Sequence, residues 1–188
     1  MSAAAGPAAP AARPTSVLTA IRCAAPRDRV WNALVFFEEI GRRPPWPLRA
    51  LLPAPLRAEG ARSAVGDETR CLYESGDLVK RMTLVRPPLR CEFDVIAQAL
   101  EIPGGIRLAG GGYSLEEAAD GSTRVAIETR YYGSRRPRAL CRPIEAAVCH
   151  AFHRHILRAI RRGAENADAA PGPNRLRLPS RTAPSPRR

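Results

Sequence analysis

Hydrophobic residues recur with two different periodicities along this chain. Over residues 17–23 and again over residues 67–132, apolar and polar residues alternate, which is typical of half-buried strands. Over residues 143–165 the apolar residues recur at helical spacing instead. A single long helix after a run of strands is expected to lie across the sheet and close its apolar face. The pattern therefore predicts a sheet, one covering helix and a cavity between them.

A shorter helix is predicted directly after the first strand. Pro26 suits a first helical turn, where its missing N–H is not needed, and Val30 and Leu34 begin an apolar series at helical spacing. These positions predict a helix over residues 26–40. The segment that follows, residues 42–60, contains five prolines, which exclude both a long helix and a central strand. We expect a loop there, with at most one short helical turn.

Turn-forming residues divide the long alternating stretch into strands. Such turns are expected at residues 75–77, 87–88, 104–105 and 120–121. With the first strand, this gives an antiparallel sheet of about six strands. Gly110, Gly111 and Gly112 precede strand-like residues, whereas nucleotide-binding glycine loops precede a helix. The three glycines therefore indicate a β-bulge that bends the sheet.

The C-terminal helix is expected to have two unlike faces. At about 100° per residue, one arc holds the apolar residues Val148, Cys149, Phe152, Ile156, Ala159 and Ile160. The opposite side holds the arginines Arg154, Arg158, Arg161 and Arg162. We expect the apolar face to cover the sheet and the basic stripe to face water.

This order of elements resembles a known family. Strand, helix, strand meander and long C-terminal helix are similar to the helix-grip fold of the SRPBCC superfamily, which includes START lipid-transfer domains, Bet v 1-like proteins and polyketide cyclases. The segments that carry the resemblance are IRCAAPRDRVWNALVFFEEI, LVKRMTLVRPPLRCEFDV, GSTRVAIETRYY and HILRAIRRGAE. The resemblance covers residues 16–166 and implies an α+β domain whose curved antiparallel sheet is closed by the long helix. It also implies a hydrophobic small-molecule ligand between sheet and helix, with catalysis in only some members.

Composition limits the chain to one domain. With 188 residues, 45% of them hydrophobic, it has room for a single core. Residues 1–15 are rich in alanine and proline, and residues 167–188 in proline and arginine, so we expect disordered ends around a domain at 16–166. The N-terminus lacks a signal-peptide pattern and no segment is apolar enough to span a membrane, which predicts a cytoplasmic protein.

The five cysteines are scattered and form no C-x-x-C pair. We interpret them as small core residues of a reducing compartment, without a disulfide or a zinc site.

Positive charge gathers toward the C-terminus. The formal net charge is +12, and residues 135–162 contain eight arginines but only one acidic residue, Glu145. More arginines follow in the tail, where they suit loose phosphate contact, but neither a recognition module nor interleaved aromatic residues accompany them. We therefore expect no specific nucleic-acid partner. An anionic membrane surface remains an alternative partner for the basic region and for the loop at 42–60.

Inward-facing residues are the candidate cavity wall, although each also suits an ordinary core position. Strand alternation and the helical arc select Tyr73, Phe93, Tyr113, Ile127, Tyr131, Val148, Phe152 and Ile156 as candidate ligand-binding residues. Their three tyrosines supply hydroxyl groups that can orient a ligand.

No catalytic set is evident. On the helix His155 points away from His150 and His153, and no H-E-x-x-H pattern is present, so we expect neither a metal nor another cofactor. His153, at the edge of the apolar arc, is a candidate general acid or base. The preferred function is binding or transport of a hydrophobic small molecule, either a lipid or a polyketide-like compound. The alternatives are a cyclase or dehydratase that uses His153 and a cavity tyrosine, and membrane or nucleic-acid contact through the basic C-terminal region.

Overall fold

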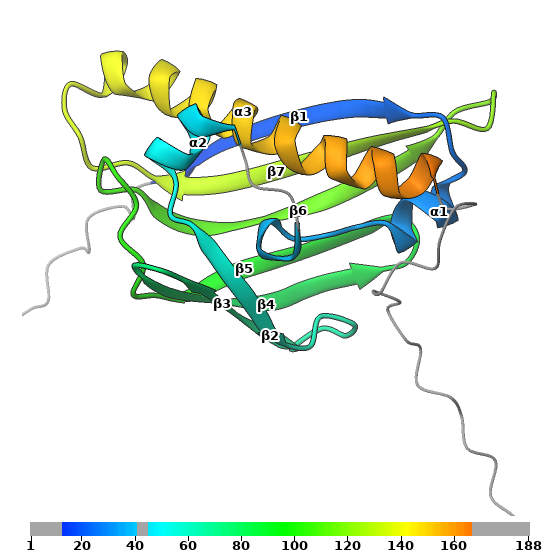
Figure 1. Ribbon diagram of the computed structural model, residues 1–188, viewed down its shortest axis with the longest axis horizontal. Helices are drawn as coiled ribbons and strands as arrows, with labels where there is room; N and C mark the ends of the chain where they lie inside the picture. Colours follow the sequence, from blue (N-terminus) through cyan, green and yellow to red (C-terminus); the bar gives the residue numbers. More distant parts are fainter. Residues whose placement is uncertain (1–12, 41–44, 167–188) are drawn as a thin grey trace, which may run out of the picture.

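A curved sheet with one long helix across its concave side forms the body of the protein (Figure 1). The computed structural model describes residues 13–40 and 45–166. Its helical elements are α1 (Arg27–Asn32), the 3₁₀ turn η1 (Phe37–Glu39), α2 (Trp46–Leu51) and α3 (Arg138–Glu165). The predicted helix-grip architecture is confirmed. The predicted disordered ends, 1–15 and 167–188, lie outside the described residues except for 13–15.

All seven described strands are antiparallel and belong to one sheet, in the order β1-β7-β6-β5-β4-β3-β2. They are β1 (Thr15–Cys23), β2 (Pro55–Gly60), β3 (Glu68–Tyr73), β4 (Gly76–Arg86), β5 (Arg90–Gln98), β6 (Arg107–Glu117) and β7 (Thr123–Tyr132). The four predicted turns separate β3 to β7, as expected. Val125, Ile127 and Tyr131 of β7 are buried, so the predicted inward face of the last strand is also confirmed.

The glycines of β6 lie where this strand leaves its regular pairing. The register between β6 and β7 shifts between Leu108 and Gly110, which confirms the predicted bulge. A Cβ atom on Gly111 would collide with the carbonyl oxygen of Glu128 and would press on the Phe93 ring. Only glycine allows the backbones to approach this closely, and the bulge helps the sheet to curve around the space beneath α3.

The first predicted helix is wrong in its extent. A helix was expected over residues 26–40, but α1 ends at Asn32, and the chain is extended at Phe36 before it enters η1. This break lets two adjacent phenylalanines pack in different places. The Phe36 ring lies 5.6 Å from the Phe93 ring of the sheet, whereas the Phe37 ring lies 4.9 Å from the Phe152 ring of α3. Tertiary packing thus overrides the helical spacing seen in the sequence.

The segment predicted as a loop, residues 42–60, contains both α2 and β2. Proline occupies the first turn of α2, where it disturbs no helical hydrogen bond. Strand β2 lies at the edge of the sheet and begins at Pro55, a position that proline tolerates. The prolines exclude a central strand, as predicted, but they are compatible with a strand at the edge of the sheet. The sheet therefore has seven strands, one more than expected.

Helix α3 begins five residues before the predicted start at 143. Pro143 lies inside the helix, in its second turn. Both Pro143 and Ala139, whose carbonyl oxygen loses its helical donor, are exposed, so water can satisfy that oxygen.

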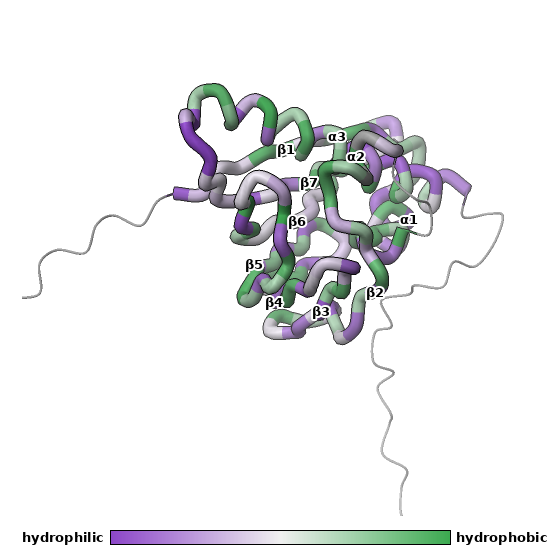
Figure 2. Tube along the Cα trace, turned by 60° about the vertical axis from the view of Figure 1, so that its left-hand side comes forward, coloured by the Kyte–Doolittle hydropathy of each residue, from purple (hydrophilic) through white to green (hydrophobic). Residues whose placement is uncertain are grey.

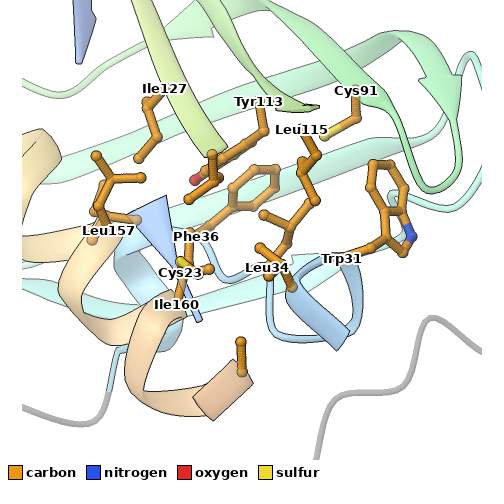
Figure 3. Close-up of a cluster of buried hydrophobic side chains, with 14 of the residues drawn as sticks. Cys23, Trp31, Leu34, Phe36, Cys91, Tyr113, Leu115, Ile127, Leu157 and Ile160 are labelled. Carbon is orange, nitrogen blue, oxygen red and sulfur yellow. The ribbon is translucent and has the colours of Figure 1, made fainter. Parts of the chain in front are cut away.

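The main hydrophobic core lies under the C-terminal half of α3, where Leu157 and Ile160 are fully buried. Figure 3 shows them directed toward side chains of the sheet and of the segment that contains Leu34 and Phe36. We call this cluster the closed core. A smaller cluster formed by Cys71, Leu78 and Leu100 lies toward the β2 edge of the sheet.

Candidate ligand-binding site

A cavity of about 380 Å³ lies under the N-terminal half of α3. Its wall is mainly apolar and includes Phe37, Leu51, Leu52, Pro53, Tyr73, Leu100, Ile102, Ile106, Leu108, Tyr131, Ile144, Val148 and Phe152. These residues come from α3, from the end of α2, from the sheet and from the connection between β5 and β6. The volume lies within the roughly 300–1,000 Å³ typical of small-molecule sites.

The size and the lining of the cavity favour a ligand site over a packing defect. At about 380 Å³ the cavity is many times larger than the roughly 30 Å³ that one water molecule occupies, and most of its wall is apolar. We therefore interpret it as a candidate ligand site.

The eight candidate ligand-binding residues divide between the cavity and the closed core. Those that line the cavity are Tyr73, Tyr131, Val148 and Phe152. Those that lie in or against the closed core without lining the cavity are Phe93, Tyr113, Ile127 and Ile156, whereas Tyr73 and Phe152 line the cavity and also pack against that core. Alternation along a strand identifies the side chains that point inward, but it does not tell which of them meet other side chains and which border an empty space.

Part of the wall comes from segments that sequence reasoning left out of the candidate residues. Ile102 and Ile106, in the β5–β6 connection, and Leu52, which follows α2, all line the cavity. The signal available in the sequence was the set of leucines in the proline-rich segment at 42–60.

Tyr131 brings an unsatisfied polar group to the cavity wall. Its side chain is 2% exposed, and its hydroxyl makes no hydrogen bond of regular geometry to a described residue, although the Glu145 carboxylate is close by. Burial raises the pKa of Tyr131 to about 12, and the charge of the nearby Glu145 carboxylate adds to the rise. The phenol is therefore neutral at neutral pH and available as a hydrogen-bond donor. A buried hydroxyl without a partner costs about 1–3 kcal/mol, which a ligand oxygen could recover.

The negative charge of Glu145, which lies beside Tyr131 on the cavity wall, is balanced by an arginine. Arg138 donates hydrogen bonds to its two carboxylate oxygens at 2.7 and 3.0 Å. Such a two-pronged pair fixes the geometry of both side chains. The polar groups of the cavity wall thus include a neutral phenol and a compensated ion pair, and the exposed Arg135 also lines the cavity.

A buried ion pair, missed by sequence reasoning, stands between the cavity and the closed core. The Nζ atom of Lys80 lies 3.0 and 3.1 Å from the carboxylate oxygens of Glu38, to which the Tyr73 hydroxyl also donates. The ammonium also lies 4.3 Å from the centre of the Phe36 ring, a cation–π contact. The only signal in the sequence was that Lys80 is the sole lysine of the chain.

Both members of this pair are charged. Burial raises the pKa of Glu38, but the charge of Lys80 and the hydrogen bond from Tyr73 outweigh it, so the pKa lies below its ordinary value. Burial likewise lowers the pKa of Lys80, but the Glu38 carboxylate outweighs it and the pKa is raised. Lys80 therefore remains an ammonium ion and is not an amine nucleophile.

His153, the candidate acid or base, lies behind the cavity wall. It is fully buried, and its Nδ1 and Nε2 atoms each lie 2.8 Å from a threonine hydroxyl, those of Thr19 and Thr129. Burial lowers the pKa of His153 to about 4, with the charge of His150 adding to the effect. The imidazole is therefore neutral at neutral pH. Thr129, but not His153, lines the cavity.

No group of three or more metal-ligating side chains occurs within the described ranges 13–40 and 45–166. None of the described helices is long and apolar enough to cross a bilayer.

Known structures share this architecture at low sequence identity. The chain is similar to the Zhui aromatase/cyclase from Streptomyces sp. R1128, with 15% identity and a TM-score of 0.57, over 84% of this chain and 97% of that one. It is also similar to protein MLL2253 from Mesorhizobium loti, with 16% identity and a TM-score of 0.53, over 82% and 99% of the two chains. For Ara h 8.0201 the identity is 12% and the TM-score 0.50, over 80% and 97%.

At such identities the likeness establishes the fold alone. It is the helix-grip fold, which the sequence resemblance to the SRPBCC superfamily led us to expect. No family model and no curated protein sequence matches the chain.

Proposed function

We propose that this protein binds or transports a hydrophobic small molecule, a lipid or a polyketide-like compound, in the cavity between the sheet and α3. The observation that carries the proposal is the apolar cavity of about 380 Å³. Because the buried Tyr131 hydroxyl lacks a regular hydrogen bond, we expect the ligand to have an oxygen acceptor at one end. Burial of its apolar part supplies most of the affinity, at roughly 25 cal/mol per Å².

Binding of the fluorescent probe anilinonaphthalenesulfonate, together with native mass spectrometry of the purified protein, tests this function. Val148→Trp places an indole in the cavity and should weaken probe binding at least tenfold. Ala147→Trp, one residue away and exposed, is the matched control and should bind as the wild type does. Absence of probe binding and of any co-purified apolar ligand, or equal binding by both variants, would contradict the proposal.

A second candidate function, cyclisation or dehydration of a polyketide-like substrate, is favoured by a chain of hydrogen-bonded side chains. The chain starts at Thr129 on the cavity wall and continues through His153 and Thr19 to the half-buried His150, with contacts of 2.8, 2.8 and 2.7 Å. A neutral imidazole has one donor and one acceptor nitrogen, so it can pass a proton along such a chain. Tyr131 would then polarise a substrate carbonyl.

Incubation with a poly-β-ketone thioester, followed by mass spectrometry of the products, tests the second candidate. Thr129→Val removes the hydroxyl at the cavity end of the chain while keeping the shape of the side chain, and should lower turnover at least tenfold. Thr123→Val, on the same strand but away from the cavity, is the control. Absence of turnover by the wild type, or no effect of Thr129→Val, would exclude this role for the chain.

A further inference from the structure

Exposed apolar side chains lie on α2 and on the first turns of α3, two helices that border the cavity. Leu140 and Ile144, one turn apart on α3, are each 67% exposed, and Trp46 of α2 is 77% exposed. Leu51, at the other end of α2, is also exposed. Helices α2 and α3 are in contact, and the first turns of α3 extend beyond α2 at one end of the molecule (Figure 1). Because Leu51 and Ile144 are exposed and also line the cavity, its opening lies beside these two side chains.

The same end of α3 carries positive charge without local compensation, with Arg142 on the opposite flank of the helix from Leu140 and Ile144. Arg135, Arg136 and Arg142 are exposed and form no ion pair with any described residue, whereas Arg138 is neutralised by Glu145. The first turn of α3 holds no acidic residue, although the positive end of a helix dipole favours one. Figure 2 shows hydrophilic and hydrophobic residues in close succession at this end of α3. We use the term rim for two groups of side chains. The apolar group is Trp46, Leu51, Leu140 and Ile144, and the basic group is Arg135, Arg136 and Arg142.

We propose that the rim docks on the surface of an anionic lipid bilayer, so that the cavity opens toward the membrane. The proposal rests on the proposed binding function, to which it adds a partner and a route of entry for the ligand. Interfacial binding depends on apolar side chains that enter the headgroup region and on basic residues attracted to acidic lipids. The rim presents both kinds around one opening.

Charge complementarity favours a membrane over a second copy of the chain. Two rims placed face to face would bring like charges together, and juxtaposed like charges oppose association. An anionic lipid surface instead gathers counter-charges opposite all three arginines. The β5–β6 connection, which borders the cavity, contains one acidic residue, Glu101, which is exposed and follows the lining residue Leu100. Docking through so few apolar groups is reversible, since even a single acyl anchor gives only marginal membrane binding.

Flotation of the full chain with vesicles tests the proposal. Vesicles of phosphatidylcholine alone are compared with vesicles that also contain phosphatidylserine, at low and high salt. The wild type should float with the anionic vesicles, and less so at high salt. Arg136→Glu with Arg142→Glu should weaken the partition about thirtyfold or more, on the basis of roughly fivefold for each arginine near the surface.

Matched controls separate the rim from the general positive charge of the chain. Arg154→Glu with Arg158→Glu changes two exposed arginines of the same helix, beyond the rim, and should have little effect. Trp46→Ser with Leu140→Ser should also weaken flotation, unlike Val65→Ser with Leu89→Ser, which removes apolar side chains exposed elsewhere. Equal losses in the rim variants and their controls, or no loss in the rim variants, would overturn the proposal.

Two further measurements distinguish the other outcomes. Light scattering that reveals a dimer abolished by Trp46→Ser with Leu140→Ser would assign the rim to a second copy and would overturn the membrane proposal. Neither residue lines the cavity, so probe binding to the free protein should persist in this variant. If flotation fails while probe binding persists, the membrane proposal alone falls. If probe binding fails in the wild type, the proposed function falls whatever the flotation result.

Discussion

The two halves of α3 cover the same face of the sheet with opposite results. Beneath the C-terminal half, Leu157 and Ile160 belong to one buried cluster with Phe36 and Tyr113. Beneath the N-terminal half, Val148 borders a cavity of about 380 Å³. The difference depends on what lies under the helix, because the segment after α1 fills one end only. One element can therefore serve both as core and as the wall of a binding site.

The boundary between these regions is the buried Glu38–Lys80 pair, and breaking it should have the largest effect. Lys80→Met should lower the free energy of unfolding by about 3–5 kcal/mol, because it leaves the Glu38 carboxylate buried without its counter-charge. Urea denaturation at neutral pH measures this. The double variant Glu38→Leu with Lys80→Met removes both charges and should regain most of the loss. A double variant no more stable than Lys80→Met would contradict this explanation.

The second prediction compares one substitution in the two regions. Leu157→Ala in the closed core should lower the free energy of unfolding by about 2–5 kcal/mol. Leu52→Ala on the cavity wall should cost less than half as much, because part of that side chain already borders empty space and has fewer contacts to lose. Urea denaturation of both variants measures these changes. Equal decreases in the free energy of unfolding would mean that the cavity is not open in solution.

The third prediction concerns pH and the histidine that joins α3 to β1 and β7. The pKa of His153 is about 4 in the folded protein and about 6.5 in the unfolded chain, so the unfolded chain binds the proton more readily. The contribution of this histidine to stability is complete above pH 6.5 and is lost as the pH falls toward 4, roughly 3 kcal/mol in total.

Stability measured against pH for the wild type and for His153→Gln checks this. The variant should have a flatter slope in that window, while carboxylate contributions are common to both proteins. Parallel slopes would show that His153 is not buried in its neutral form.

The smallest effects come from a pair of tyrosines. Tyr113, in the closed core, donates a hydrogen bond of 3.0 Å to the carbonyl oxygen of Val35, so Tyr113→Phe should lower the free energy of unfolding by about 1 kcal/mol. Tyr131→Phe removes a hydroxyl that has no described partner and should leave stability unchanged or raise it by up to about 1 kcal/mol. Thermal unfolding without ligand compares the two. A clear loss in Tyr131→Phe would point to a bridging water.

The fold was more predictable than the site, for a physical reason. Alternation in β7 and the glycines of β6 are local signals, and both led to correct predictions of inward residues and of a bulge. The break after α1 depends on Phe36 and Phe37 finding separate partners far along the chain, which helical spacing cannot reveal. The Glu38–Lys80 pair joins residues 42 positions apart, so no local pattern announces it.

The same limit explains the division of the candidate residues. Tyr113 and Tyr131 both lie on inward faces of neighbouring strands, yet one is in the closed core and the other is on the cavity wall. Tyr113 lies in the closed core because the segment after α1 packs against it, with the carbonyl oxygen of Val35 accepting its hydrogen bond. Whether an inward residue touches a ligand is therefore a property of the tertiary structure.

Two uncompensated arginines, Arg135 and Arg136, precede α3 at the positive end of the helix dipole, and the second turn of the helix contains the unpaired Arg142 and Pro143. These features lower the local stability of residues 138–148 relative to residues 153–164, which are anchored in the closed core. Amide hydrogens near the start of the helix should exchange with solvent through local fraying, whereas those near its end should exchange only on global unfolding. Fraying of one helix end would then admit the ligand without a hinged lid, at a rate set by the helix itself.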